Sequence, residues 1–520
     1  MEHLSYPIQS GDYASAGGAS RDLKRHLKRI GAESDAVRRA MIAAYEAEMN
    51  VVIHATDGHL EATVSDGQLD VDVIDGGPGI PDVQRAMHEG FSTASAEARA
   101  LGFGAGMGLP NIQRNSDLMR VTSTLGEGTR VSFSVMLRPE AADHGARPSS
   151  LGIAPGLCRE CRHCLVACPT VAMRVRDGRP SVLDHLCVDC TCCIGACMPG
   201  ALTLLDAPAA LDCRGVLVVP PALLAGLGDH DAETVLDELR ALGFDDVISV
   251  HPYEDELRRR VLDMAAAPGA PAPLISPVCP AVVSLIEVRF PALVPSIAAL
   301  ASPWEAVQRD LGEQDVTYVV SCPSQRTALL AQQPTAQRRT VTPQLVREAV
   351  LPSLTARRSA HGAGRGQHVQ AAGADDLLVV NGVSHVLAVL EQIEDGGLTG
   401  VTAVEPFICD GGCFGSPLLT EDAFVAAWRW AAAAGAEADG GRSFERARPP
   451  RPRPGIRLDA DMAVAIRKLG ELDTQTRGLP GRDCGVCGAP TCAALAEDIV
   501  MGRAERALCP YATTEKGSSS

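Results

Sequence analysis

Sixteen of the eighteen cysteines in this chain fall into four groups of four, and their spacing points to iron–sulfur chemistry. Two groups repeat the pattern C-x2-C-x2-C-x3-C, and a third has the pattern C-x2-C-x4-C-x16-C. Thiolates at such spacings can surround one iron–sulfur cubane within a short loop. The groups are Cys158, Cys161, Cys164 and Cys168; Cys187, Cys190, Cys193 and Cys197; Cys484, Cys487, Cys492 and Cys509; and the scattered Cys279, Cys322, Cys409 and Cys413.

Structural zinc is the main alternative for clustered thiols. Zinc is usually bound by two separated C-x2-C pairs rather than by one continuous run. The runs in this chain therefore favour iron–sulfur clusters. Cys192 and Cys213 are left over, and we interpret them as packed thiols rather than ligands.

The duplicated run resembles the two-cluster ferredoxins of bacteria. In those modules the fourth cysteine of each run ligates the other cluster. The resemblance thus implies one cluster on Cys158, Cys161, Cys164 and Cys197, and a second on Cys168, Cys187, Cys190 and Cys193. Met198 separates the last cysteine from the proline that usually follows it, which leaves the ligands intact.

Three stretches, residues 275–287, 320–323 and 408–417, resemble the catalytic domain of iron-only hydrogenases. In that family these stretches hold the cubane half of the active-site cluster. The resemblance assigns this role to the scattered cysteines Cys279, Cys322, Cys409 and Cys413. The first two follow apolar stretches that read as strands, where α/β folds place their ligand loops.

The hydrogenase-like part of the chain differs from active hydrogenases at the groups that serve hydrogen turnover. Val278 stands where the family has a proton-relaying cysteine, and Gln325 stands where a lysine holds a cyanide of the diiron unit. The third motif is shortened to Gly-Ser-Pro. We expect a cubane without efficient hydrogen turnover. A modified diiron cluster used for sensing, or no cluster, are the alternatives.

Residues 479–492, together with Cys509 and the proline after it, look like the small four-iron domain of electron-transfer complex subunits and corrinoid iron–sulfur proteins. Glycines in the loop allow the backbone to wrap closely around a cubane. We expect a helix over 493–506 to return Cys509 to the cluster. A zinc ion bound by the same cysteines is the alternative.

Three motifs in the N-terminal part resemble the GHKL ATP-binding fold, nearest to the anti-sigma-factor serine kinases. They are Glu46-x3-Asn50, the stretch 75–81 (DGGPGIP) and the stretch 102–109 (GFGAGMGL); GEGT at 126–129 follows. Spacing of i, i+4 places Glu46 and Asn50 on one helix face. The alternative is a degenerate fold that binds no nucleotide.

The GHKL resemblance implies a role for each motif residue. Glu46 is the catalytic base, and Asn50 offers Mg²⁺ an oxygen ligand. Asp75 accepts a hydrogen bond from the adenine amino group. The remaining cofactor-binding positions are Gly77 and Gly79 beneath the base, Gly104, Gly106 and Gly108 in a lid over the triphosphate, and Thr129 on the opposite side. No phospho-acceptor histidine domain precedes these motifs, which disfavours a histidine kinase.

The helices and strands expected from the sequence indicate a multidomain α/β and α+β protein. A helix over 33–54 and strands over 69–74 and 130–135 belong to a GHKL α/β sandwich at 1–140. A ferredoxin-like two-cluster module follows at 150–207. Apolar strands at 215–220, 247–250, 273–279, 316–322 and 377–380, separated by helices, predict a parallel sheet in a hydrogenase-like α/β domain at 210–430. An extended, exposed Pro/Arg-rich linker at 436–455 leads, through a helix over 459–472, to a small Fe–S domain at 457–515.

Charge and composition exclude some partners. The net charge of −17 makes nucleic acid and anionic membranes poor candidates. No apolar run reaches the roughly 18 residues that a membrane span needs, and the N-terminus lacks the pattern of a secretory signal. We expect a cytoplasmic protein, where clustered thiols signify metal more often than disulfide.

Three functions remain open at this point. The first is a redox or hydrogen sensor whose ATP-binding domain phosphorylates or sequesters a regulatory protein, such as an anti-anti-sigma-type partner. The second is an electron-transfer or iron-only-hydrogenase-type subunit that works with a redox protein and has an accessory ATP domain. The third is a non-catalytic scaffold. Kinases of the resembled type commonly pair, which is compatible with a homodimer.

Overall fold

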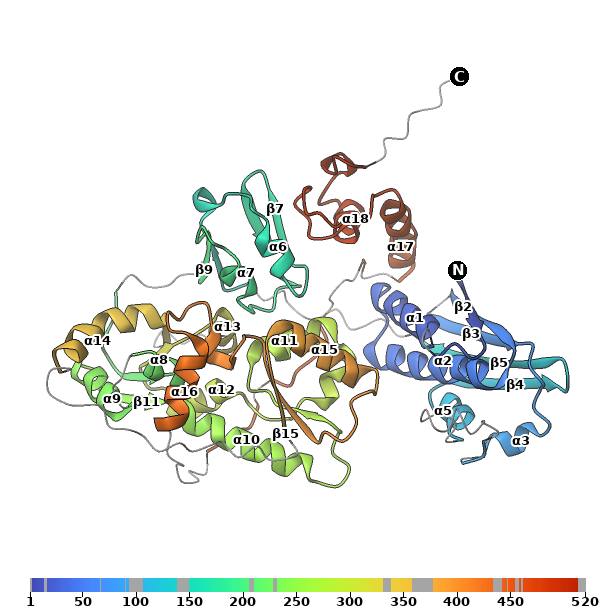
Figure 1. Cartoon of the computed structure of the whole chain (residues 1–520), viewed down its shortest axis with the longest axis horizontal. Helices are drawn as coiled ribbons and strands as arrows, with labels where there is room; N and C mark the ends of the chain where they lie inside the picture. The colour runs from blue at the N-terminus through green and yellow to red at the C-terminus, as the bar shows by residue number, and fades with distance from the viewer. Residues whose placement is uncertain are drawn as a thin grey trace, which may run out of the picture.

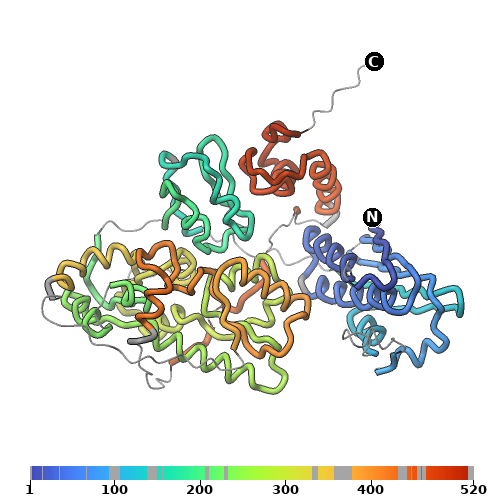
Figure 2. The backbone as a smooth tube through the Cα atoms, viewed as in Figure 1, coloured from blue at the N-terminus to red at the C-terminus, as the bar shows by residue number. Residues whose placement is uncertain are grey.

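The computed structural model describes residues 2–13, 16–65, 67–88, 90–92, 106–137, 149–204, 210–227, 232–330, 338–357, 377–433, 442–446, 448–453, 458–459 and 462–512. Figures 1 and 2 show four regions along the chain, which we name by their place in the sequence. They are the N-terminal region (2–137), the ferredoxin-type region (149–204), the central region (210–433) and the C-terminal region (458–512).

The N-terminal region is one antiparallel sheet with helices against one face (Figure 1). The strand order is β1-β2-β3-β5-β4, from Glu2–Gln9, Asp57–Ser65, Gln68–Asp75, Gly128–Met136 and Leu118–Thr124. Every second residue of β3 is buried, namely Leu69, Val71 and Val73. This alternation turns one face of the sheet to the helices. The helices are α1 (Gly18–Arg29), α2 (Ser34–His54), α3 (Val83–Ala86) and α5 (Gly108–Arg114).

The predicted helix over 33–54 and the two predicted strands of this region are confirmed as α2, β3 and β5. Helix α1 and strands β1, β2 and β4 were not predicted.

The ferredoxin-type region consists of two small antiparallel ribbons and two short helices. Strand β6 (Leu151–Ile153) pairs with β9 (Leu202–Leu204), and β7 (Met173–Arg176) pairs with β8 (Arg179–Val182). The turn η1 (Pro155–Leu157) follows β6. Helices α6 (His163–Ala167) and α7 (Cys192–Gly195) occupy matching places in the two cysteine runs. This symmetry follows the repeat in the sequence.

The central region contains two parallel sheets, so the prediction of parallel sheet is confirmed. One sheet has the order β11-β10-β13-β14 and the other β12-β16-β15. The strands are β10 (Val216–Val219), β11 (Asp246–Ser249), β12 (Leu274–Ile275), β13 (Val316–Val319), β14 (Arg338–Val341), β15 (Leu377–Asn381) and β16 (Ala403–Phe407). The predicted strands over 273–279 and 316–322 end earlier than expected, because the chain leaves the sheet before Cys279 and Cys322.

Helices cover both sheets of the central region. They are α8 (Pro221–Ala225), α9 (Ala232–Ala241), α10 (His251–Ala265), α11 (Pro280–Arg289), η2 (Pro291–Ser296), α12 (Pro303–Leu311), α13 (Pro323–Leu330), α14 (Pro343–Arg357), α15 (Val383–Glu394), η3 (Gly412–Gly415) and α16 (Ala423–Ala433). The apolar side chains of α10, α11, α12 and α15, together with those of β10, β13 and β16, form the largest hydrophobic core of the described residues. Those of α8, α9 and α14 form a second core with β11 and β14.

The segment predicted as an exposed linker is docked over part of its length. Phe444 is buried in the core of the central region, and its carbonyl accepts a hydrogen bond from the N–H of Ala301 (2.9 Å). The N–H of Arg453 donates to the carbonyl of Glu287 (2.8 Å). The expectation of full exposure is therefore wrong for these residues, because the chain carries both an aromatic side chain and arginines that find partners.

The C-terminal region comprises α17 (Met462–Arg477), α18 (Cys492–Val500) and the turn η4 (Arg506–Leu508). The helix predicted over 493–506 ends earlier, at Val500. Gly502 takes a left-handed conformation (φ 70°), and the N–H of Arg503 donates to the carbonyl of Asp498 (2.7 Å). These features turn the chain back toward Cys509. In the described part of the chain, no helix is both long enough and apolar enough to cross a membrane.

Candidate nucleotide site and cysteine clusters

A cavity of about 880 Å³ lies in the N-terminal region between α2, β3 and the start of α5. This volume is in the range of small-molecule sites. Seven of the predicted nucleotide-binding residues line it: Glu46, Asn50, Asp75, Gly79, Gly106, Gly108 and Thr129. Gly77 lies beside the cavity, where its N–H donates to Asp75 Oδ1 (2.7 Å). Gly104 is outside the described residues.

Helix α2 presents Glu46 and Asn50 to one end of this cavity. Asn111 of α5 donates from Nδ2 to Glu46 Oε1 (2.6 Å), which fixes the carboxylate. Gly108 packs so close to Asn50 that a Cβ there would lie 3.0 Å from Oδ1. Asn111 was missed by the sequence reasoning. The sequence pointed to Asn111 only by its position, three residues after Gly108 at the end of the glycine-rich stretch.

Asp75 lines the same cavity and holds two backbone N–H groups beside it. Its Oδ1 accepts hydrogen bonds from the N–H groups of Gly77 (2.7 Å) and Thr129 (3.2 Å). Gly79 has a φ of 77°, and a Cβ there would lie 2.3 Å from the carbonyl oxygen of Thr124. Only glycine fits such a position. Ser123 accepts from the N–H of Ile80 (2.7 Å) and was also not predicted.

His54 ends α2 and lines the same cavity. Burial lowers the pKa of His54, and the nearby Asp75 carboxylate opposes that shift. A histidine with a lowered pKa is neutral near pH 7.

The two cysteine runs of the ferredoxin-type region exchange their last members. Cys158, Cys161, Cys164 and Cys197 line one cavity of about 20 Å³, which we call quartet A. Cys168, Cys187, Cys190 and Cys193 line another cavity of about 20 Å³, quartet B. The structure thus brings the cysteines together in the crossed arrangement that the resemblance implied.

The thiols of both quartets are hard to ionise without a compensating charge. Burial, followed by the charges of the other cysteines of quartet A, raises the pKa of Cys164 to about 11. Burial, followed by the charge of Asp189, raises the pKa of Cys187 to about 12. Since metal ligands must be thiolates, a bound cluster would supply the positive charge that these sites lack. The donor set fits an iron–sulfur cluster.

Cys279, Cys322, Cys409 and Cys413, quartet C, come together from separate loops of the central region. Cys279 and Cys322 directly precede α11 and α13, Cys413 lies in η3, and Cys409 follows β16. Burial raises the pKa of Cys413 well above its usual value, and the charges of Glu254 and of the other three cysteines add to this. Four soft sulfur donors in a desolvated site suit an iron–sulfur cluster.

Gln325 and Val278 have structural surroundings that explain the departures from active hydrogenases. Gln325 is 2% exposed, and its Oε1 accepts from the N–H of Ser321 (2.7 Å), so it holds the loop that carries Cys322. Ser416 of the shortened third motif donates to the carbonyl of Ser321. Val278 lies in the hydrophobic core. Neither position offers an ionisable group to quartet C.

Cys484, Cys487, Cys492 and Cys509, quartet D, lie in the C-terminal region. Burial raises the pKa of Cys487, and the charges of Cys509 and Cys484 contribute to the rise. Cys492 begins α18, and its N–H donates to Oδ1 of Asp483 (2.6 Å), the residue directly before Cys484.

Across the described part of the chain, no group of three or more His, Cys, Asp or Glu is spaced to hold a single metal ion.

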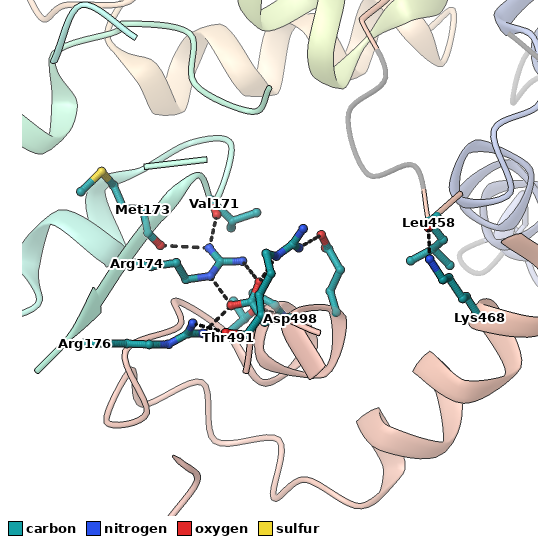
Figure 3. A network of polar contacts seen from close by, with 11 residues as sticks. Val171, Met173, Arg174, Arg176, Leu458, Lys468, Thr491 and Asp498 are labelled. Carbon is teal, nitrogen blue, oxygen red and sulfur yellow. Dashed lines mark hydrogen bonds and ion pairs between the residues drawn. The ribbon is translucent and has the colours of Figure 1, made fainter. Parts of the chain in front are cut away.

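Direct contacts connect quartet D to quartet A and quartet B to quartet C. Burial raises the pKa of Cys193 of quartet B, and Cys164 of quartet A lies close enough for its charge to contribute to the rise. The N–H of Val175 in β7 donates to the carbonyl of Gly488 (2.9 Å). The two backbones lie so close that a Cβ on residue 488 would be 1.9 Å from the carbonyl oxygen of Val175. Arg174 of the same strand pairs with Asp498 of α18 (Figure 3). Thr191, between Cys190 and Cys192, has its Oγ1 3.7 Å from the sulfur of Cys409.

Additional residues that the sequence reasoning missed join the ferredoxin-type and central regions. Asp189, between Cys187 and Cys190 in the sequence, accepts from Thr327 Oγ1 (2.6 Å) of α13 and from the N–H of Ser150 (3.1 Å). Cys192 lies close enough to Cys279 to affect its ionisation, which places this extra thiol between quartets B and C.

Three family matches agree with this arrangement. Residues 36–139 match the histidine kinase-, DNA gyrase B- and HSP90-like ATPases. Residues 215–320 match the C-terminal domain of the iron-only hydrogenase large subunit, and residues 479–511 match a family of Fe-S cluster domains. The hydrogenase match ends before Cys322, so it contains Cys279 alone of quartet C.

The serine/threonine-protein kinase RsbT of Bacillus subtilis is 33% identical over 125 residues, which are 23% of this chain and 88% of RsbT. An anti-sigma F factor of Caldanaerobacter subterraneus is 37% identical over 103 residues, 20% of this chain and 64% of that protein. An apo FeFe-hydrogenase structure from Chlamydomonas reinhardtii aligns over 47% of this chain and 88% of that chain, with 14% identity and a TM-score of 0.30.

The ATPase match contains α2, β3 and the residues of the 880 Å³ cavity. The two other matches contain Cys279 of quartet C and the whole of quartet D. Through its N-terminal region the chain therefore belongs to the histidine kinase-, DNA gyrase B- and HSP90-like ATPases of the anti-sigma-factor-kinase kind, joined here to hydrogenase-like and Fe-S domains.

Proposed function

We propose that this chain is a redox-responsive regulator in which iron–sulfur clusters set the activity of an ATP-dependent serine/threonine-kinase-like domain. The observation that carries the proposal is the union of two sites in one chain. One is the cavity lined by Glu46, Asn50 and Asp75. The other is quartet C, a hydrogenase-like site that lacks the groups for hydrogen turnover at Val278 and Gln325.

The N-terminal cavity suits phosphoryl transfer from ATP. Asp75 would accept the adenine amino hydrogen bond, and Asn50 Oδ1 would offer an oxygen ligand to Mg²⁺. The acceptor hydroxyl oxygen bonds to the γ-phosphorus as the bond from phosphorus to the ADP oxygen breaks, and Glu46 takes the hydroxyl proton. Asn111 acts as a positioning residue, since its Nδ2 lies 2.6 Å from Glu46 Oε1.

The four quartets suit clusters that exchange single electrons, which is the chemistry that a bound 4Fe-4S cluster supplies. Protein groups around the sulfurs would tune their potentials. The N–H of Ala172 donates to Cys168 Sγ (3.2 Å), and the hydroxyl of Ser149 lies 3.5 Å from Cys187 Sγ. The signal in this proposal is the redox state of the clusters. Hydrogen would be the signal in the alternative in which quartet C carries a modified diiron cluster.

The partner in this proposal is a regulatory protein with a serine or threonine hydroxyl, of the anti-anti-sigma type, or a regulatory protein that the N-terminal region sequesters. The two relatives, a serine/threonine-protein kinase and an anti-sigma factor, support both forms. A homodimer through the N-terminal region is part of the same proposal.

Phosphoryl transfer is tested with the Glu46→Gln variant. Loss of the general base should lower transfer of labelled γ-phosphate to an anti-anti-sigma-type protein by about 10²-fold or more. ATP affinity should change little, because the variant keeps the shape of the side chain. Glu61→Gln, on β2 and not among the residues that line the cavity, is the matched control. Equal transfer by wild type and Glu46→Gln would exclude Glu46 as the base.

A second candidate is an electron-transfer subunit. The contacts that connect quartets D, A, B and C in sequence favour it, because such a row suits electron passage through the chain. It predicts sustained hydrogen production from a low-potential donor, lost in Cys279→Ser. Absence of hydrogen production by fully loaded protein would favour the sensor.

A further inference from the structure

Two lysines of α1 in the N-terminal region reach the end of α15 in the central region. Lys24 Nζ lies 2.7 Å from Glu394 Oε2, and Lys28 Nζ lies 3.1 Å from Glu394 Oε1. The side chains of Lys24 and Glu394 are only 10% and 8% exposed. Both oxygens of one carboxylate are thus paired inside an interface between two regions that lie far apart in sequence.

Lys28 also contacts the end of a second helix of the central region. Its Nζ donates to the carbonyl of Arg289 (3.2 Å), the last residue of α11. Cations favour the C-terminal end of a helix, where carbonyls lack partners. Burial lowers the pKa of Lys28, while Glu394 acts in the opposite direction, so the ammonium is held in a partly dehydrated contact.

Helices α11 and α15 both begin at quartet C. Cys279 directly precedes α11. Gly382 directly precedes α15, and its N–H donates to the carbonyl of Cys409 (3.2 Å). With 10 and 12 residues, the helices span about 15–18 Å. Two rigid elements therefore run from the cysteines of quartet C to the lysines of α1.

On the other side of the contact, α1 is attached to the helix that carries the nucleotide residues. Glu48 of α2 is buried, and its carboxylate accepts from the N–H groups of Ala19 (3.2 Å) and Ser20 (3.1 Å) at the start of α1. Glu46 and Asn50 line the cavity from the same helix. In addition, α2 packs beside η2, the turn that follows α11.

The ferredoxin-type region reaches the same place. Arg289 donates from its guanidinium to the carbonyl of Pro169 (2.8 Å), the residue after Cys168 of quartet B. The same guanidinium lies 3.8 Å from Glu391 on α15. Arg289 therefore contacts all three regions, through its side chain and its carbonyl.

We propose that this junction, Lys24 and Lys28 on Glu394 and the Arg289 carbonyl, is the regulatory interface through which quartet C and the ATP cavity influence each other. This inference rests on the proposed function and adds the structural route by which the redox state of quartet C would reach the ATP cavity. Coupling between distant sites needs an element with two arrangements. A change of charge at quartet C would shift the ends of α11 and α15, and the buried ion pair would transmit that shift through α1 and α2 to Glu46 and Asn50.

The test is the ratio of ATP dissociation constants in the oxidised and dithionite-reduced states of cluster-loaded full-length protein. In Glu394→Gln and in Lys24→Met/Lys28→Met we expect the ratio to fall to within about twofold of one, while the wild type keeps a several-fold ratio. Arg25→Ala is the matched control, since Arg25 lies on the same helix, is exposed and pairs with Asp22. It should retain the wild-type ratio.

The outcomes separate this inference from the function on which it rests. A several-fold ratio in the wild type that persists in both variants would overturn the junction and leave the sensor intact. A ratio of one in the wild type would overturn both. The lysine variant changes only the N-terminal region, so it remains informative if Glu394→Gln fails to load its clusters. Cluster content, measured from the visible spectrum, and circular dichroism verify that each variant is folded.

Discussion

Arg174 and Asp498 form an ion pair that is almost completely shielded from water. Arg174 Nε lies 2.5 Å from Asp498 Oδ2, and the two side chains are 3% and 1% exposed. Arg176 (2.6 Å) and Arg503 (3.1 Å) surround the same carboxylate. Burial opposes ionisation of Asp498, but hydrogen bonds and charges from Arg174 and Arg503 outweigh it and lower its pKa. The pair joins β7, beside quartet A, to α18, beside quartet D.

Replacing Asp498 by Ala should release the C-terminal region from the ferredoxin-type region. Removal of one partner of a buried pair leaves an uncompensated charge, which typically costs about 3–5 kcal/mol. Arg174→Met should cost less, because Arg176 and Arg503 still neutralise the carboxylate. The measurement is the rate at which a protease cleaves the C-terminal region of the full chain.

The control for this prediction is Arg477→Ala, which removes an exposed pair with Asp473 in the same region. Exposed pairs contribute about 0–1 kcal/mol, so protection should be unchanged. Equal protection in Asp498→Ala and wild type would show that the ion pair does not hold the two regions together.

Asp75→Asn should weaken ATP binding. The carboxylate holds the N–H groups of Gly77 and Thr129 and is the predicted acceptor for adenine. Hydrogen bonds to charged groups contribute about 1.5–3 kcal/mol, so affinity should fall by about 10–100-fold. Asp72→Asn is the control, because Asp72 lies on the same strand and accepts from Ser132 outside the cavity. Calorimetric titration of both variants with ATP measures the two affinities. A similar loss of ATP affinity in both variants would show that Asp75 has no special role in ATP binding.

His54 should make the N-terminal region less stable below neutral pH. Its folded pKa lies below the unfolded value of about 6.5, so the unfolded chain binds more protons as the pH falls through 6.5. The free energy of unfolding therefore rises with pH across this window and levels off above it. His54→Gln should flatten the slope between about pH 5.5 and 7. Pulse proteolysis of the nucleotide-free chain in urea measures the free energy of unfolding at each pH. Equal slopes in wild type and His54→Gln would contradict this role of His54.

The sequence predicted elements best where local pattern and side-chain chemistry agree. The alternation in β3 and the long apolar face of α2 identified both elements, and glycines at 77 and 79 marked a turn that only glycine can make at Gly79. The resemblance to two-cluster ferredoxins implied the crossed grouping that quartets A and B show.

Contacts between distant segments could not be predicted in the same way. Glu394 and Lys24 carry no motif, and their pairing depends on how two folded regions dock. Asn111 and Ser123 act through side chains that meet Glu46 and Ile80 only in the folded state. The linker around Phe444 was judged by its prolines and arginines, although one buried aromatic ring decides where it packs.

Coupling between ATP and the clusters is reciprocal by thermodynamic necessity. A non-hydrolysable ATP analogue should therefore shift the midpoint potential of at least one cluster. A tenfold difference in ATP affinity between redox states corresponds to about 59 mV for a one-electron couple. Electron paramagnetic resonance during a redox titration, with and without the analogue, measures the shift. Asp75→Asn, which binds ATP weakly in this account, should show a smaller shift at the same analogue concentration.

Redox control of the ATP site is tested by the ATP affinity of anaerobically purified, cluster-loaded protein, measured first oxidised and then reduced with dithionite. We expect a change of several-fold or more, because the proposed regulator couples the cysteine quartets to the cavity of Glu46, Asn50 and Asp75. Equal affinities in the two states, together with equal ATP turnover, would contradict the sensor and leave the electron-transfer subunit as the better description.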